Sequence, residues 1–200
     1  MTKFNFIKIA TAIASTLMFT HVGQAAPRAM VAGDRTTQPI GHYELCQQMP
    51  SECSQKTRRT GAVELTRALW KDLVRINNDV NEEVAPLTDQ PMWGREEVWS
   101  YPQGQGDCED YVLEKRKRLM KMGLPAGNLL ITVVRQRNGA GHAVLTVRTS
   151  LGDFILDNLE NKVLDWTETE YTYLKRQSDR NSGAWVAITN GTATAVGSVK

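Results

Sequence analysis

The sequence has few cysteines, few histidines and almost no excess of charge, and each shortage excludes a class of protein. It contains three cysteines and three histidines in 200 residues, and its 24 Lys and Arg nearly balance 22 Asp and Glu. Three cysteines are too few for a disulfide-dense scaffold, and a hydrophobic content of 41% is too high for a disordered chain. The interleaved charges form no basic stripe, which excludes a nucleic-acid partner. The length predicts one domain with a sizeable core.

Long hydrophobic runs are also missing, apart from one short run near the N-terminus. A basic start precedes a mostly apolar run from Ile9 to Phe19, and small residues follow near position 25. This run is much shorter than the roughly 20 apolar residues of a membrane-spanning helix, so a secretory signal is favoured over a membrane anchor. We therefore expect a cleaved signal peptide at residues 1–25, a periplasmic location, and no stable membrane insertion of the mature chain.

The cysteines become informative if the chain enters an oxidising compartment. Cys46 and Cys53 lie close together in a stretch with proline and serine, where a disulfide can close a short loop; the alternative is three free thiols. Prolines and glycines interrupt any regular hydrophobic spacing in residues 26–60, so we expect an extended N-terminal segment that carries this disulfide. Cys108 is then left as a single free thiol, and residues 191–200 are expected to fray.

Hydrophobic spacing predicts two helices and then short strands in a domain at residues 61–190. Apolar residues from Leu65 to Val80 recur at helical spacing, and Thr60 is a candidate N-cap. A second helix is expected from Cys108 to Met122. The side chain of Met122 is expected to point to the interior. Short strands are expected at residues 129–134, 142–147, 154–156 and 184–188. Helices before hairpin-linked strands indicate an α+β fold, with N-terminal helices packed on an antiparallel sheet.

A loop-like stretch rich in glycine and proline separates the two helices at residues 87–106. It carries three aromatic residues, Trp93, Trp99 and Tyr101. Aromatic side chains on a loop either cover the core or line a substrate site, and the sequence leaves both interpretations open.

Cys108 is a candidate nucleophile because it begins the second helix. Unpaired N–H groups and the helix dipole favour an anion there, which lowers the pKa of a thiol. The alternative, a small buried residue, fits poorly with the polar residues around it. A thiol nucleophile needs a base, and His142 opens a strand after a glycine-rich turn. His42 is the competing histidine, but it lies in the segment beside the expected disulfide.

Asp157 is the candidate that orients the imidazole of His142. If the turn of the hairpin centres between Ser150 and Leu151, Asp157 lies opposite Val144 and one diagonal step from His142. Both side chains then share one face of the sheet. This register predicts a carboxylate within reach of the imidazole.

Acidic residues surround the candidate nucleophile, at Asp107, Glu109 and Asp110. Nearby negative charge raises the pKa of a thiol, and a bound divalent cation would reverse that effect. Oxygen ligands of this kind suit calcium, with Asp107 and Glu109 as candidate metal ligands. The alternative is that Asp107 caps the helix while the other two carboxylates favour its N-terminal dipole.

Three separated motifs resemble those of the bacterial transglutaminase-like cysteine peptidases. They are Gly106-Asp-Cys-Glu-Asp-Tyr111, Gly141-His-Ala-Val-Leu145 and Leu156-Asp-Asn-Leu159. The resemblance covers roughly residues 60–190 and implies a papain/transglutaminase-like core. It also implies a catalytic triad in which Cys108 is the nucleophile, His142 the base and Asp157 its orienter.

One branch of that family, the LapG-type periplasmic proteases, depends on calcium and releases surface adhesins under the control of an inner-membrane receptor. Acidic residues beside the nucleophile take part in calcium binding in that branch, and Asp107 and Glu109 match them. The resemblance therefore implies calcium as cofactor, a protein substrate in the cell envelope and an inner-membrane receptor as partner. The Cys46 and Cys53 pair is not typical of the branch, which leaves an adhesin substrate open.

The implied chemistry is thiol-dependent acyl transfer, and the sequence does not fix the acceptor. Transfer to water gives an endopeptidase or a deamidase, and transfer to an amine gives a transglutaminase. A non-catalytic envelope protein that uses the same fold to bind a peptide or receptor is the remaining alternative. The backbone N–H of Cys108 is the expected oxyanion donor, with Gln103 or Gln105 as a second.

Overall fold

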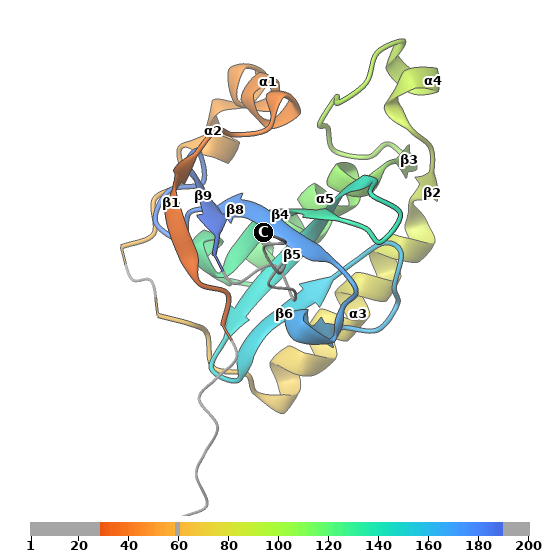
Figure 1. Cartoon of the computed structure of the whole chain (residues 1–200). Coiled ribbons are helices and arrows are strands. Elements are labelled where there is room, and N and C mark those ends of the chain that lie inside the picture. Colours follow the sequence, from red (N-terminus) through yellow and green to blue (C-terminus); the bar gives the residue numbers. More distant parts are fainter. Residues whose placement is uncertain (1–28, 59–60, 190–200) are drawn as a thin grey trace, which may run out of the picture.

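A seven-stranded antiparallel sheet forms the centre of the computed structural model, which describes residues 29–58 and 61–189 (Figure 1). Every neighbouring pair of strands in this sheet is antiparallel. In spatial order the strands are β1 (Ala32–Thr36), β9 (Trp185–Ile188), β8 (Thr172–Gln177), β4 (Leu129–Arg135), β5 (Gly141–Thr149), β6 (Gly152–Leu156) and β7 (Leu164–Asp165).

Two long helices, α3 (Arg67–Glu83) and α5 (Cys108–Lys121), pack together on one face of the sheet (Figure 1). The predicted α+β class is therefore confirmed. The smaller elements are α1 (Ile40–Gln48), α2 (Pro50–Cys53), α4 (Asp89–Trp93), two 3₁₀ turns (Ala126–Asn128 and Trp166–Glu168), and the parallel pair β2 (Ala85–Pro86) and β3 (Gln105–Gly106). None of the described helices is both long and apolar enough to cross a membrane.

The boundaries of both long helices follow from capping chemistry. The hydroxyl of Thr66 accepts a hydrogen bond from the N–H of Leu69 at 3.1 Å and so caps α3, whereas Thr60, the expected cap, lies outside the described residues. Helix α5 ends before Gly123, whose φ of +95° is readily adopted only by glycine. Met122 is 42% exposed there, so its expected place in the interior is wrong.

The hairpin of β5 and β6 has the predicted register. Leu145 pairs with Leu156 and Thr149 with Gly152, so the turn centres between residues 150 and 151. Asp153 of β6 pairs with Arg148 of β5 and is buried, so it lies in the sheet and not in the turn.

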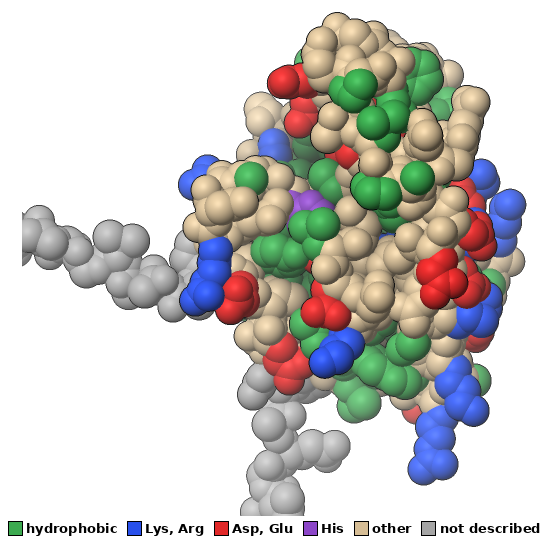
Figure 2. Space-filling model, turned by 90° about the vertical axis from the view of Figure 1, so that its right-hand side faces the viewer, with side chains coloured by type: hydrophobic (Ala, Val, Ile, Leu, Met, Phe, Trp, Pro, Cys, Tyr) green, Lys and Arg blue, Asp and Glu red, His purple; other side chains and the backbone are tan. Residues whose placement is uncertain are grey.

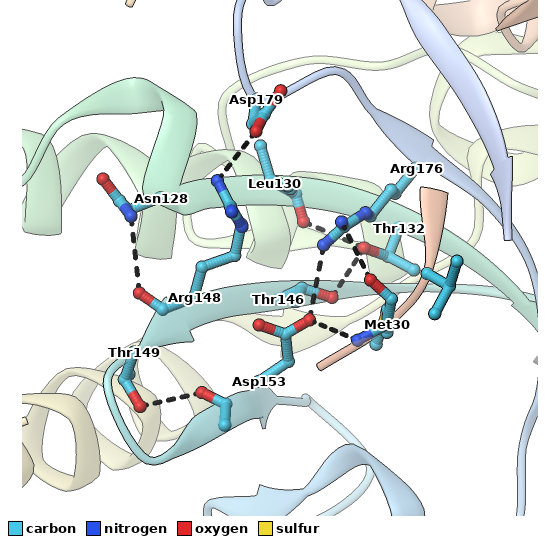
Figure 3. Close-up of polar contacts among 12 residues, drawn as sticks. Met30, Asn128, Leu130, Thr132, Thr146, Arg148, Thr149, Asp153, Arg176 and Asp179 are labelled. Atoms are coloured by element: carbon cyan, nitrogen blue, oxygen red, sulfur yellow. Dashed lines mark hydrogen bonds and ion pairs between the residues drawn. The ribbon is translucent and has the colours of Figure 1, made fainter. Parts of the chain in front are cut away.

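A buried polar network ties the start of the described chain to the sheet (Figure 3). The carboxylate of Asp153 accepts a hydrogen bond from the N–H of Met30 at 2.9 Å and forms an ion pair with Arg176 at 3.4 Å. Met30 also packs with apolar residues on the sheet face opposite α5, among them Val144 and Ile155. Because each buried charge has a partner, the network fixes this face without an isolated charge.

The N-terminal segment is extended only in part, which corrects the expectation for it. Ala32–Thr36 form strand β1, but Ile40–Gln48 and Pro50–Cys53 form the short helices α1 and α2, and Cys46 and Cys53 form the expected disulfide. Pro39 precedes the first turn of α1, where a missing N–H does not disturb a helix. The side chain of Leu45, on the inner face of α1, is buried in the main core. The expected signal peptide and the expected C-terminal tail at residues 191–200 lie outside the described residues.

Candidate active site

Cys108 and His142 line one cavity of about 380 Å³ on the surface of the protein. Cys108 is the first residue of α5, and His142 is the second residue of β5, so the packing of this helix on this strand brings them together. The remaining wall is mixed. It includes the apolar residues Ile40, Trp99 and Val133 and the charged residues Glu97, Glu109 and Lys175. In Figure 2 a histidine is visible in a hollow of the surface, with hydrophobic side chains around it.

His142 is oriented by Asp157, as the register predicts. The Nε2 atom of the imidazole lies 2.8 Å from Oδ1 of Asp157, and both side chains are buried. An ionised carboxylate only accepts hydrogen bonds, so Nε2 carries the proton and Nδ1 is the nitrogen left to exchange a proton with a nucleophile.

Asp157 is held in its ionised form by several donors. Its Oδ1 also accepts the N–H of Leu159 at 3.0 Å, and its Oδ2 accepts the hydroxyl of Tyr171 at 2.5 Å. Burial alone would raise the pKa of Asp157, but the hydrogen bond and charge of His142, together with these two donors, bring that pKa below its usual value.

The surroundings of Cys108 favour the thiol over the thiolate. Burial, and then the charge of Glu109 and a hydrogen bond from Sγ to its carboxylate at 2.9 Å, raise the pKa of Cys108. Asp107 adds to this effect, while a hydrogen bond with the backbone of Ala143 opposes it. The lowering of the pKa expected at a helix start is therefore outweighed, first by burial and then by the carboxylates.

A third carboxylate, which sequence reasoning missed, completes the acidic cluster beside Cys108. Oxygen atoms of Asp89, Asp107 and Glu109 lie within 4.8 Å of one another. Asp89 comes from α4, 18 positions before Asp107 in the chain, and no local pattern marks it. Burial and the neighbouring charge of Asp107 raise the pKa of Glu109 to about 8, and burial and Asp89 raise the pKa of Asp107.

The cluster fits a hard divalent cation. Oδ1 of Asp89 and Oδ1 of Asp107 are buried and accept no hydrogen bond from the described part of the chain. Buried polar atoms are normally satisfied, so two such oxygens beside a third carboxylate indicate a missing partner. Carboxylate oxygens are the ligands that calcium prefers.

His42, the competing histidine, has a structural environment. It is 1% exposed, packs edge-on against Trp99 and Trp185, and does not line the Cys108 cavity. Its Nδ1 accepts the indole N–H of Trp185 at 3.2 Å. Burial and the charge of Arg116 lower the pKa of His42 to about 4, so it is neutral near pH 7.

The aromatic loop contributes to the core and to the wall of the cavity that holds Cys108. Trp99 is buried in the main core and also lines the Cys108 cavity, whereas Trp93 is 49% exposed. A side chain at Gly41 would place its Cβ 2.3 Å from the Trp99 ring, so glycine is required where α1 meets this loop. Gln103 and Gln105 line a different pocket with Trp93, away from the cavity that holds Cys108.

Comparisons with known proteins agree with the resemblance read from the motifs. The family profile described as bacterial transglutaminase-like cysteine proteinase matches residues 32–193. Among solved structures, Legionella pneumophila LapG is 28% identical over 58% of this chain and 68% of its own, with a TM-score of 0.50. An EGTA-treated form is 27% identical over 62% and 70%, again with a TM-score of 0.50.

A calcium-bound form of Legionella pneumophila LapG is 22% identical over 76% of this chain and 93% of its own, with a TM-score of 0.49. None of the curated proteins matches the sequence. The family match spans most of the chain and includes Cys108, His142 and Asp157. The chain therefore belongs to the bacterial transglutaminase-like cysteine proteinases and is a transglutaminase-like cysteine peptidase.

Proposed function

We propose that this peptidase cleaves an envelope or surface protein in the periplasm, with Cys108 as nucleophile, His142 as base and Asp157 as the residue that orients the base. The observation that carries the proposal is the hydrogen bond between His142 and Asp157, made by a histidine that shares a cavity with the free thiol. The family membership supports a protein substrate. The periplasmic location rests on the leader-like segment at residues 1–25.

The chemistry assigned to these residues is acyl transfer in two steps. His142 accepts the thiol proton at Nδ1, and the sulfur of Cys108 attacks the carbonyl carbon of a peptide bond. The proton then passes from His142 to the leaving amine, and the C–N bond breaks to give a thioester. Water, activated by the same imidazole, hydrolyses the thioester and restores the thiol. The N–H of Cys108 at the helix start is the proposed oxyanion donor.

Calcium belongs to the proposal as a cofactor held by Asp89, Asp107 and Glu109. Its support is the cluster of buried carboxylates, two of which leave an oxygen without a hydrogen bond from the described residues. When bound, the cation supplies positive charge that offsets the carboxylates and favours the thiolate of Cys108. An inner-membrane receptor, which the family resemblance implies, is a further part of the proposal, to be tested by affinity capture from solubilised inner membranes.

Cells that carry Cys108→Ala test the reaction and the substrate together. Comparing surface and released proteins with those of wild-type cells should show at least one protein that is released only by the wild type. A Tyr43→Ser strain, altered at an exposed residue of α1, is the control and should release it normally. Equal release from all three strains contradicts the peptidase proposal. Incorporation of a labelled amine instead of cleavage would show transglutaminase chemistry.

Calcium binding is tested on the purified protein by calorimetry and thermal unfolding. Calcium should bind the wild type and raise its Tm, and Asp89→Asn should abolish both effects. The matched control is Asp79→Asn, which removes an exposed carboxylate on α3 that pairs with Arg75. A Tm that does not respond to calcium in the wild type contradicts the cofactor. Because this readout needs no catalysis, it is independent of the triad.

A further inference from the structure

Tyr171 contacts both members of the buried pair at the active site. Its hydroxyl donates to Oδ2 of Asp157 at 2.5 Å, the oxygen that His142 does not use. Its ring lies 5.5 Å, between centroids, from the imidazole of His142. Tyr171 directly precedes β8 and lies outside all three motifs that mark the triad in the sequence.

The residues of the proposed triad line two separate cavities, and Tyr171 lines the second of them. Cys108 and His142 line the first cavity, while Asp157 and Tyr171 line another of about 520 Å³ that shares no lining residue with it. Asp157 is nevertheless only 3% exposed. The hydroxyl of Tyr171 thus occupies the side of the carboxylate that water in this second cavity would otherwise solvate.

We propose that Tyr171 is a positioning residue for the reaction: its hydroxyl fixes Asp157, its ring packs beside His142, and together they limit the access of water to the pair from the second cavity. This inference rests on the proposed triad. A carboxylate fixed at both oxygens has one orientation, so the imidazole that donates to it also has one orientation. The hydroxyl of Tyr171 acts through Asp157 and bonds neither His142 nor Cys108.

The charges around Asp157 decide the sign of the expected pH effect. His142 on β5 and the hydroxyl of Tyr171 stabilise the carboxylate, and the buried Lys115 of α5 also interacts with it. Tyr173 of β8 faces the same region as a neutral phenol whose pKa is raised, first by burial. Loss of the Tyr171 hydroxyl removes a stabilising donor, so the pKa of Asp157 rises and the acid limb of activity moves to higher pH.

Tyr171→Phe isolates the hydroxyl because it keeps the ring against His142. The matched control is Tyr173→Phe, which removes a neighbouring hydroxyl that bonds Thr169 and not Asp157. The readout is the rate of alkylation of Cys108 by iodoacetamide across pH, with calcium present. Cys108 is the one free cysteine, because Cys46 and Cys53 form a disulfide. Thermal unfolding of each variant reports on the fold.

The expected result is about a tenfold slower alkylation of Tyr171→Phe near pH 7 and an acid limb about one pH unit higher, the effect of one hydrogen bond to a charged group. Tyr173→Phe should stay within about twofold of the wild type. In an Asp157→Asn background, Tyr171→Phe should have almost no further effect, because it acts through that carboxylate.

Two outcomes overturn the inference. One is a pH profile of Tyr171→Phe that matches the wild type, and the other is an equal loss in both tyrosine variants, which would reflect damage to the segment around β8. A wild type that reacts no faster than His142→Gln would instead refute the triad itself. The two failures are therefore distinguishable, and neither requires a known substrate.

Discussion

Two buried histidines, His42 and His142, differ in their partners far more than in their burial. They are 1% and 6% exposed, so burial does not separate them. His42 lies between two tryptophans and against the disulfide, with its Nε2 3.7 Å from the sulfur of Cys53. His142 has a carboxylate on one nitrogen and a thiol in the same cavity. Of the two, only His142 has a carboxylate acceptor that would stabilise its charged form, as the proposed base requires.

The electrostatics of the two sites follow from these partners. No carboxylate among the described residues bonds to His42, and burial with the charge of Arg116 lowers its pKa to about 4. A protonated imidazole there would be a buried cation without an anion. Asp157 supplies that anion to His142, and its own donors keep it ionised. His42 is thus a neutral residue of the core, whereas His142 has an anionic partner for its N–H.

The largest expected effect is the loss of activity in His142→Gln. Release of the surface protein should fall by roughly a thousandfold or more, as expected when the base of a nucleophile is removed. His42→Gln should keep most of this activity, since glutamine can still accept the N–H of Trp185. The measurement is cleavage by the purified variants of the protein identified as shed. A larger loss in His42→Gln than in His142→Gln would reverse the assignment.

The sequence predicts the parts of the site that depend on local patterns. Cys108 begins α5 because a polar, glycine-containing stretch precedes an amphipathic run. His142 and Asp157 meet because the hairpin turn at residues 150 and 151 sets their register, and a one-residue shift would separate them. These contacts follow from spacing within one helix or one hairpin.

The sequence does not predict the contacts that depend on packing between distant elements. Asp89 reaches the acidic cluster from α4, and Tyr171 reaches Asp157 from the start of β8, in stretches without a motif. Strand β8 itself lacks an apolar pattern because Arg176 and Gln177 are buried and satisfied by Asp153 and the N–H of Ile131. Buried polar residues with specific partners conceal a strand from periodicity.

The next largest expected effect is a pH dependence of stability that is caused by the titration of His42. The pKa of His42 is about 4 in the folded protein and 6.5 in the unfolded chain, so between these values only the unfolded chain binds the proton. The free energy of unfolding should therefore fall as pH falls from 6.5 towards 4, by up to about 3 kcal/mol from this group.

Denaturant unfolding of the wild type and of His42→Gln at several pH values measures this contribution. Other titrating groups, including the acidic cluster, are present in both proteins and largely cancel in the difference. The difference in free energy should change with pH only below about 6.5. A difference that is constant from pH 7 to pH 4 would show that folding does not lower the pKa of His42, contrary to its surroundings.

The smallest expected effect comes from the disulfide that packs against His42. Replacing both Cys46 and Cys53 by alanine opens a loop with a sequence separation of 7, and a loop of this size should cost about 2 kcal/mol of stability. Alkylation of Cys108 should keep its rate, because neither sulfur lines its cavity. A stable double variant with slow Cys108 alkylation would show that the two histidine regions are coupled. If the double variant is less stable than the wild type but its Cys108 is alkylated at the same rate, the disulfide contributes to stability and not to the reactivity of Cys108, as expected for His42 too.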